Sequence, residues 1–376
     1  MLSDELDTFA EALSSNGYYT QGYANNPNIT SVYNFNQGFH GYVDLKPDLY
    51  LGATPSAARL SLYEVLRRVI LRVVGPLTGR GMRVGDFYQP AESVTEHALA
   101  WIDGPDRPQG AAFLLFLHYM DPHDPFMDWE RPGVGYARAQ LGDPDPDPYR
   151  DLMRDAYDQE VAYFDEHLGA YLDSLRERGL YDDALIIITA DHGEEFYDHQ
   201  GWWHGQTLYD EVLHVPLIVK LPGGMLRGTV NESFARLIDL PVTMLAWAGA
   251  PVPEDMAGRT LVGPDGRFGN AETEFVYAEN DFENNVLQAV RTFDAKLIHA
   301  NPDNPRQTPS VAFFDLLVDR AEHENRAGGG DPREIDLERV MTEMQAFVLD
   351  RATEPVLMEG IPDELREQLE AIGYGG

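Results

Sequence analysis

Acidic and imidazole side chains follow two apolar stretches of the chain, in the segments DPHDP (121–125) and DHGEE (191–195). Four of the 11 histidines lie in or shortly after these segments: His123, His192, His199 and His204. A carboxylate beside an imidazole, such as Asp191 beside His192, can hold a divalent cation. A histidine that follows a strand often only caps a loop, but the grouping of these four side chains favours one shared site.

The apolar stretches have the length and composition of buried strands. FLLFLHYM (113–120) leads into the first acidic segment, ALIIITA (184–190) leads into the second, and VPLIVKL (215–221) follows. Strands that are apolar on both sides and separated by helices indicate a mainly parallel sheet with helices on both faces. Because ligands collect at the carboxyl ends of strands in such sheets, the two acidic segments are expected at one edge.

The spacing of apolar residues predicts helices over residues 6–13, 57–75, 91–102, 161–175 and 336–351. For the first helix, Ser3 is the expected N-cap and Gly17 the expected stop. The basic helix at 57–75 is expected to face the core, although an amphipathic helix on a membrane surface is an alternative. Beyond residue 250 shorter strands alternate with Pro, Gly and acidic residues. We therefore expect an α/β domain of residues 1–250 and an α+β region of residues 251–376.

The composition restricts the partners of the chain. The formal net charge is −35, from 63 acidic and 28 basic residues, and this charge repels nucleic acid and anionic membranes. Such acidity is typical of proteins adapted to high salt. The alternative is that the chain is an acidic mesophilic protein from a GC-rich genome. Without cysteine there is no disulfide and no thiolate metal site. We expect no membrane span, and a cytoplasmic location because the first residues lack the pattern of a signal peptide.

Three long blocks of the sequence resemble the sulfatase family of the alkaline phosphatase-like superfamily. They are FLLFLHYMDPHDPF, YDQEVAYFDEHLGAYLDSLRERGLYDDALIIITADHGEEF and HGQTLYDEVLHVPLIVKLPG, and they stand in the family's order and spacing. Weaker similarities, such as LDTFAEALSSNGYYTQGYANNPNI, extend the resemblance over nearly the whole chain. The resemblance implies an alkaline phosphatase-like fold and hydrolysis of a small-molecule or carbohydrate sulfate ester. It also implies a divalent metal, with calcium the expected ion.

The resemblance assigns roles to four residues. Asp191 and His192 match two metal ligands, His123 matches the histidine that contacts the sulfate, and His204 lies where a Lys or His approaches the leaving oxygen. These roles are chemically reasonable because a cation and imidazoles can stabilise charge on a tetrahedral anion and protonate a departing oxygen.

The family's first metal-binding strand, with its paired aspartates, and its C-x-P-S-R or S-x-P-S-R nucleophile signature have no match in this sequence. The stretch ATPSAAR (53–59) resembles the signature with alanine at the nucleophile position, but it follows a block that the signature should precede. The nucleophile, a formylglycine, is therefore expected only in a longer form of the protein. The alternatives are a truncated pseudoenzyme or binding protein, and a phosphodiesterase or phosphoryl transferase of the same superfamily, since those branches share the DHG motif.

We predict that the purified 376-residue chain hydrolyses no aryl sulfate, because it lacks the nucleophile signature. Release of nitrophenol from 4-nitrophenyl sulfate measures this directly. Turnover above that of a heat-denatured control would contradict the assignment of the nucleophile to a longer form.

Overall fold

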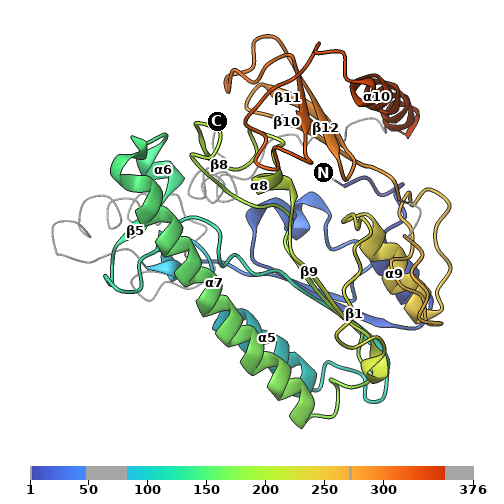
Figure 1. Cartoon of the computed structure of the whole chain (residues 1–376). Helices are drawn as coiled ribbons and strands as arrows, with labels where there is room; N and C mark the ends of the chain where they lie inside the picture. Colours follow the sequence, from blue (N-terminus) through green and yellow to red (C-terminus); the bar gives the residue numbers. More distant parts are fainter. Residues whose placement is uncertain (1, 48–82, 271–272, 352–376) are drawn as a thin grey trace. The chain divides into compact units, whose positions relative to one another are not determined.

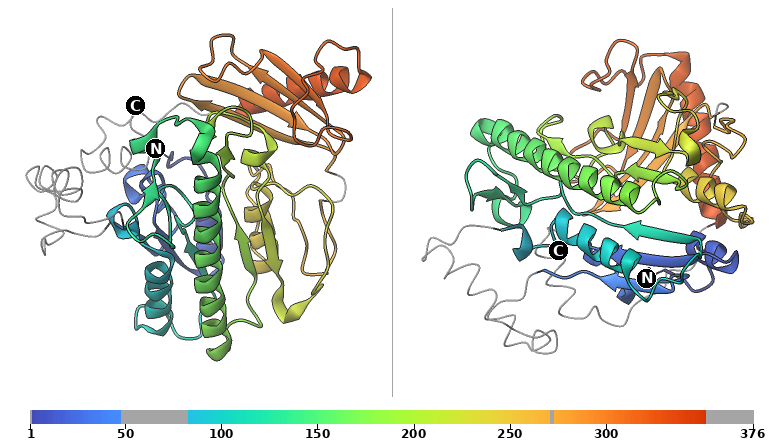
Figure 2. Two further views of the ribbon diagram at one scale, coloured as in Figure 1. Left: turned by 60° about the vertical axis from the view of Figure 1, so that its left-hand side comes forward. Right: turned by 90° about the horizontal axis from the view of Figure 1, so that it is seen from below.

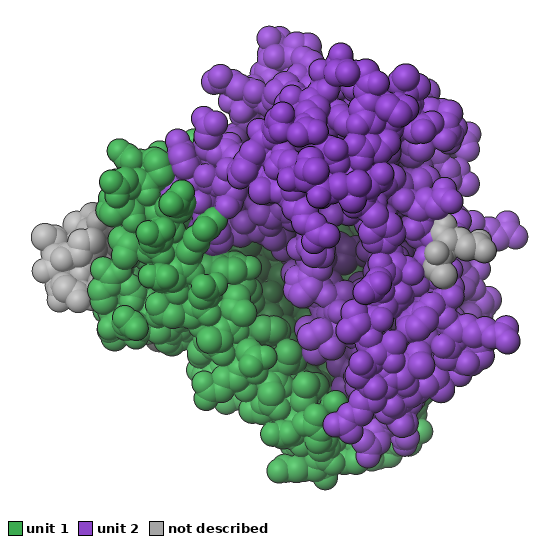
Figure 3. Space-filling model, in the orientation of Figure 1, with its two compact units in different colours: residues 1–181, 356–376 green, residues 182–355 purple. Residues whose placement is uncertain are grey.

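The computed structural model describes residues 2–47, 83–270 and 273–351. Two compact units make up the described chain, divided between Tyr181 and Asp182 (Figure 3). Each unit is described by itself. The expected boundary near residue 250 stays a prediction, and the helix predicted at 57–75 and the ATPSAAR stretch lie outside the described residues.

The first unit contains a parallel sheet with the strand order β2-β1-β3. Its strands are β1 (Tyr19–Ala24), β2 (Gly41–Asp44) and β3 (Phe113–Leu117). The helix α1 (Phe9–Ser15) precedes β1, and it begins later than the sequence pattern indicates. Its N-cap is Thr8 rather than Ser3, because Thr8 and Glu11 exchange hydrogen bonds in a capping box.

Two helices of the first unit, α5 (Ala91–Asp103) and α7 (Pro146–Glu177), run side by side (Figures 1 and 2). The sequence pattern locates α5 closely but finds only the second half of α7, because acidic residues and Pro148 interrupt the apolar spacing before Glu160. Shorter elements lie between and after the strands: η1 (Pro27–Ile29), η2 (Ser31–Tyr33), η5 (Val84–Asp86), β4 (Phe126–Met127), β5 (Gly135–Tyr136) and α6 (Arg138–Leu141).

The second unit begins with β6 (Ile186–Thr189), which pairs with β9 (Leu217–Lys220) in antiparallel register. A parallel sheet, as predicted from the sequence, is found in the first unit. The predicted strands ALIIITA and VPLIVKL correspond to β6 and β9, which pair in antiparallel rather than parallel register. Between β6 and β9 lie β7 (Glu195–Phe196), β8 (Trp202–Trp203) and α8 (Asp210–Leu213). The elements η6 (Pro222–Gly224) and α9 (Asp239–Ala248) follow.

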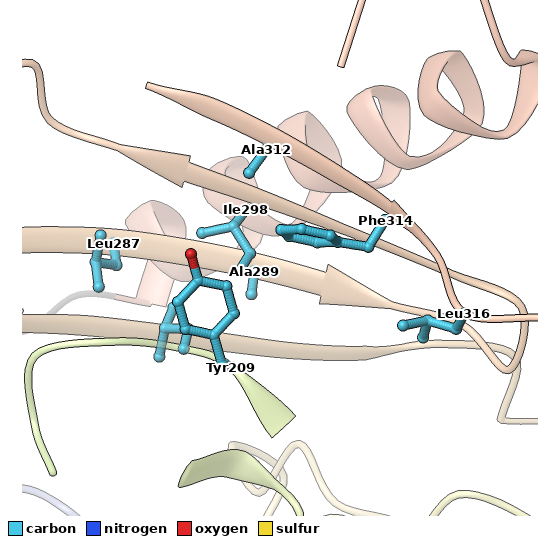
Figure 4. Packing of buried hydrophobic residues seen from close by; sticks show 8 residues of the cluster. Tyr209, Leu287, Ala289, Ile298, Ala312, Phe314 and Leu316 are labelled. Carbon is cyan, nitrogen blue, oxygen red and sulfur yellow. The ribbon is translucent and has the colours of Figure 1, made fainter. Parts of the chain in front are cut away.

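A four-stranded antiparallel sheet completes the second unit, with the order β10-β11-β12-β13. Its elements are β10 (Val276–Phe282), β11 (Asn285–Arg291), β12 (Ala295–Ala300) and β13 (Val311–Asp315), followed by α10 (Pro332–Arg351). Because side chains alternate along a strand, the sheet has two apolar faces. Leu337 and Met341 of α10 cover one face, and Leu208 and Tyr209 pack on the other (Figure 4).

One lysine in the second unit is completely buried. Lys296 on β12 is 0% exposed, and its Nζ lies 2.9 Å from Oδ1 of Asp210 and 2.7 Å from Oε1 of Glu322. Arg291 also pairs with Asp210, at 2.9 Å. Burial would raise the pKa of Asp210, but Lys296 and Arg291 outweigh it and lower this pKa below the ordinary value. These ion pairs join the segment between β8 and β9 to the C-terminal sheet.

The architecture agrees with the predicted fold class, since it combines a parallel sheet, flanking helices and a C-terminal region rich in strands. In the described residues no helix is long and apolar enough to cross a membrane.

Replacing Lys296 with methionine should lower the free energy of unfolding by about 3–5 kcal/mol, because Asp210 and Glu322 would stay buried with less positive charge between them. Urea unfolding followed by circular dichroism measures the change. The matched control is Arg339→Gln, which removes an exposed pair with Glu343 and should cost less than about 1 kcal/mol. An equal loss in the two variants would contradict the anchoring role of Lys296.

Candidate active site

The DHG turn directly follows β6, and its backbone approaches a neighbouring segment very closely. The N–H of Gly193 donates to the carbonyl oxygen of Val212 at 2.7 Å. A Cβ atom at position 193 would lie 2.1 Å from the carbonyl oxygen of Glu211, so only glycine fits there. The glycine of the motif therefore lets the turn pack against the segment that leads into β9.

The side chain of His192 is held in one orientation by its own turn. Its Nδ1 lies 2.8 Å from the carbonyl oxygen of Gly193, and its backbone N–H donates to Oδ1 of Asp191 at 3.1 Å. A carbonyl oxygen accepts only, so Nδ1 carries the proton and Nε2 is the nitrogen that can bind a metal.

Asp191 and His192 fit one side of a metal site. Nε2 of His192 lies 3.8 Å from Oδ1 of Asp191, and the Asp191 side chain is 69% exposed. A cation that binds each ligand atom at about 2.0–2.6 Å can span this separation. The described residues contain no group of three or more His, Asp or Glu arranged to hold a metal ion. These two residues therefore supply part of a coordination shell.

His204 lies directly beside His192. The two rings stack with centroids 4.0 Å apart and an angle of 24° between their planes. Nδ1 of His204 lies 3.2 and 3.1 Å from the two carboxylate oxygens of Glu194, and both side chains are buried. The structure thus brings the predicted metal ligand and the predicted leaving-group histidine together in the second unit.

His199 occupies a different environment from that pair. Its Nδ1 contacts Oε1 of Glu211 at 2.5 Å, its Nε2 lies 3.1 Å from the carbonyl oxygen of Glu322, and its ring stacks on Tyr209. Burial would lower the pKa of His199, but Glu211 outweighs it and raises this pKa. Since both ring nitrogens face acceptors, the imidazole is satisfied only when both are protonated. His199 therefore has its own buried partners, Glu211 and the backbone of Glu322, and is not a companion of His204.

Glu195 and Arg306 form an ion pair that fixes the segment between β6 and β9. The sequence did not indicate a role for either residue. The guanidinium of Arg306 lies 2.9 and 3.1 Å from the carboxylate oxygens of Glu195, which also accepts the N–H groups of His199 and Gly201. A Cβ atom at position 201 would lie 1.7 Å from the Arg306 guanidinium, so a larger residue there would displace this side chain from its pairing with Glu195. Glu195 and Arg306 are 111 residues apart, so no local pattern signals their contact.

His123 belongs to the first unit, in the turn after β3. Its Nδ1 lies 2.8 Å from the carbonyl oxygen of Asp124 and 3.2 Å from Oδ1 of the same residue. The hydroxyl of Tyr88 donates to the carbonyl oxygen of His123 at 3.1 Å. This residue is held with its Nδ1 edge toward buried acceptors, which leaves Nε2 as the atom that can act on a ligand.

Two buried carboxyl groups support the turn around His123. Glu160 of α7 accepts the N–H of Met127 at 2.9 Å and is 0% exposed. Burial, followed by the charge of Asp121, raises the pKa of Glu160 to about 8. Burial also raises the pKa of Asp121 to about 7, although the backbone amides of Asp121 and Ala91 act in the opposite direction.

The folded chain should therefore lose stability as the pH rises. Asp121 and Glu160 keep protons when folded at pH values where the unfolded carboxyls, with pKa values of 3.8 and 4.5, have released them. The stability that they contribute is complete below these unfolded values. It is lost as the pH approaches about 7 for Asp121 and about 8 for Glu160, at about 1.4 kcal/mol per pH unit for each group.

Asp121→Asn and Glu160→Gln should each flatten this decline in urea unfolding measured between about pH 5 and 8. The control is Asp128→Asn. Burial would raise the pKa of Asp128, but Arg131 lowers it below 3.8, so this variant should keep the slope of the parent protein. Parallel slopes in the parent and both test variants would contradict the protonated state of the buried carboxyls.

Two family models match the chain. The Sulfatase model matches residues 2–250, and the model for the C-terminal region of N-sulphoglucosamine sulphohydrolase matches residues 198–349. The chain is 29% identical over 304 residues to the multifunctional alkaline phosphatase superfamily protein PehA of Trinickia caryophylli, covering 67% of this chain and 58% of the relative. It is 28% identical over 225 residues to an N-acetylglucosamine-6-O-sulfatase of Bacteroides thetaiotaomicron, covering 56% and 39%. The chain thus spans about half the length of these relatives.

Solved structures share the fold at low sequence identity. A structure in complex with its substrate D-glucosamine-2-N,6-O-disulfate superposes with a TM-score of 0.67 at 17% identity, covering 93% of this chain and 84% of the other. The phosphonate monoester hydrolase of Silicibacter pomeroyi superposes with a TM-score of 0.64 at 22% identity, covering 93% and 81%. These likenesses identify the alkaline phosphatase-like fold, and the family-model match over residues 2–250 places the chain in the sulfatase family.

Proposed function

We propose that this chain provides the substrate-facing residues and part of the cation site of an enzyme that hydrolyses sulfate esters. The observation that carries the proposal is the stacking of His204 on His192, with 4.0 Å between the ring centroids. It sets a possible proton donor beside a possible metal ligand, as the hydrolysis of an ester of a strong acid requires. Membership of the sulfatase family supports the choice of a sulfate ester.

In the proposed reaction, a sulfate monoester and water give an alcohol and hydrogen sulfate. The bond between sulfur and the alcohol oxygen breaks, and that oxygen receives a proton from Nε2 of His204, which is doubly protonated at this step and becomes the neutral Nδ1–H form that faces Glu194. His123, when it is also protonated on both ring nitrogens, donates a hydrogen bond from Nε2 to a sulfate oxygen that stays on sulfur. Both contacts become stronger as negative charge develops in the transition state.

Asp191 and His192 are the residues proposed to hold a divalent cation, which would neutralise charge on the sulfate when bound. Calcium is the ion implied by the family resemblance, and the Asp191 carboxylate suits it. The imidazole of His192 suits manganese or zinc better. The formylglycine nucleophile is proposed for a longer form of the protein, so binding is the appropriate measurement for this chain.

The proposed substrate is a carbohydrate sulfate rather than an aryl sulfate. Support comes from the match to the model named for N-sulphoglucosamine sulphohydrolase and from the relative named N-acetylglucosamine-6-O-sulfatase. The alternative within the superfamily is a phosphonate or phosphate diester, which the likeness to a phosphonate monoester hydrolase supports at the level of fold. Adaptation to high salt and a cytoplasmic location stay predictions of the sequence, as does the absence of a nucleic-acid partner.

The experiment is a calorimetric titration of the purified chain with glucosamine 6-sulfate, 4-nitrophenyl sulfate and 4-nitrophenyl phenylphosphonate, each with calcium, magnesium, manganese or zinc. We expect cation-dependent binding of the sugar sulfate. His123→Ala and His204→Ala should each weaken it about 10- to 100-fold, the effect of removing a hydrogen bond to a charged group. Asp191→Asn should weaken binding of the cation itself.

His97→Ala is the matched control, because His97 is an exposed histidine on α5 and its loss should leave binding unchanged. Failure of every sulfate ester to bind with every cation would refute the proposed function. Tighter binding of 4-nitrophenyl phenylphosphonate than of either sulfate would favour the phosphonate alternative.

A further inference from the structure

The two candidate substrate-contacting histidines both face acceptors with Nδ1, but the acceptors differ. For His204, both carboxylate oxygens of Glu194 lie within 3.2 Å of Nδ1. For His123, the acceptor is the backbone carbonyl oxygen of Asp124 at 2.8 Å, and Oδ1 of Asp124, at 3.2 Å, accepts no hydrogen bond from the described residues. Carboxylate and carbonyl oxygens only accept hydrogen bonds, so Nδ1 carries a proton in both rings.

The two carboxylates are almost completely buried. The side chains of Asp124 and Glu194 are 1% and 5% exposed. A buried carboxylate is costly unless donors surround it, so Glu194 has a strong reason to keep the Nδ1–H of His204. Oδ2 of Asp124 accepts the N–H of Arg138 at 2.9 Å, which fixes this carboxylate at the start of α6.

The two adjacent glutamates of the DHGEE segment make different contacts. Glu194 faces His204, whereas Glu195 accepts Arg306 and the N–H groups of His199 and Gly201. Their side chains point apart because neighbouring residues of an extended segment alternate in direction. Glu194, directly after the glycine, therefore contacts the candidate site residue His204. Glu195, the next residue, fixes the loop through Arg306.

We propose that Glu194 is a positioning residue for His204. Its carboxylate keeps a proton on Nδ1 of His204, so that Nε2 is the nitrogen that takes up and releases the proton given to the ester. This inference rests on the proposed function, which it deepens by naming the residue that sets the working tautomer. The physical basis is the one by which a buried aspartate orients the histidine of a serine protease triad.

The decisive variant is Glu194→Gln. The glutamine amide can present its NH₂ group to Nδ1, and a ring nitrogen that faces a donor must be the unprotonated one. The tautomer of His204 should then change from Nδ1–H to Nε2–H. The effect at His123 in Asp124→Asn should be smaller, because the carbonyl oxygen of residue 124 still accepts from Nδ1.

The tautomers are read from long-range ¹H–¹⁵N correlation spectra of the full chain labelled with ¹⁵N-histidine, at one pH. We expect Nδ1 of His204 to carry the proton in the parent protein and to lose it in Glu194→Gln. The matched control is Glu211→Gln, which removes a carboxylate from His199 and should change only the His199 resonances. If Glu194→Gln does not fold, Glu194→Ala removes the same acceptor and should also lose the pure Nδ1–H form.

An unchanged His204 tautomer in the folded Glu194 variant would overturn the positioning role, whatever the protein binds. Sugar-sulfate binding is a separate readout. We expect Glu194→Gln to weaken it about 10- to 100-fold, because the neutral amide no longer stabilises the doubly protonated ring that the proposed reaction uses. A changed tautomer in a protein that binds no sulfate ester would uphold the role of Glu194 and count against the proposed function.

Discussion

The buried ammonium group of Lys296 is the interaction on which the second unit depends. It lies between Asp210, at the start of α8, and Glu322, after β13, and its positive charge compensates these two carboxyl groups, with Arg291 as a second partner of Asp210. The loop that carries His192 and His204 ends at α8. The ion cluster therefore connects the candidate site chemistry to the four-stranded sheet, and the C-terminal region acts as a support for the loop.

The same loop is held at a second point by Glu195 and Arg306, and by the glycines that allow close approach. Gly193 lets the backbone meet Glu211, and Gly201 leaves space for the Arg306 guanidinium. With both points fixed, the segment between β6 and β9 can keep two imidazole rings stacked, with His204 buried and His192 partly exposed. The chain has only three lysines, so the burial of one of them in this cluster indicates a structural use of positive charge.

In the first unit, buried carboxyl groups are made neutral by protonation rather than compensated by a lysine. Around His123 the carboxyls of Asp121 and Glu160 are buried, and their raised pKa values keep them neutral over part of the physiological range. Neutral carboxyls can be packed without a counter-ion. The two units thus hold their candidate histidines by different electrostatic means, although each histidine has a carboxylate at Nδ1.

The sequence by itself determined the family, the presence of a parallel sheet, and the positions of α5, α10 and the apolar strands β3, β6 and β9, although β6 and β9 pair with each other in antiparallel register. These properties follow from short-range signals, such as apolar runs in β3 and β6 and the order of motifs along the chain. Local patterns also marked His123, Asp191, His192 and His204 as candidates, and the pairing of His192 with His204 agrees with that selection. The capping box at Thr8 was readable from the spacing of Thr8 and Glu11, but the apolar residue Leu6 pointed to an earlier start.

Only the tertiary structure decided which acid serves which histidine. Glu194 and Glu195 are identical neighbours in the sequence, and their different roles depend on Arg306, 111 residues from Glu195. The separation of His199 from the candidate site depends in the same way on Glu322, 123 residues away along the chain. The antiparallel pairing of β6 and β9 likewise depends on the path of the loop between them. Contacts of this range leave no periodic trace in a single sequence, because they are set by how distant segments pack and by which buried charges must find partners.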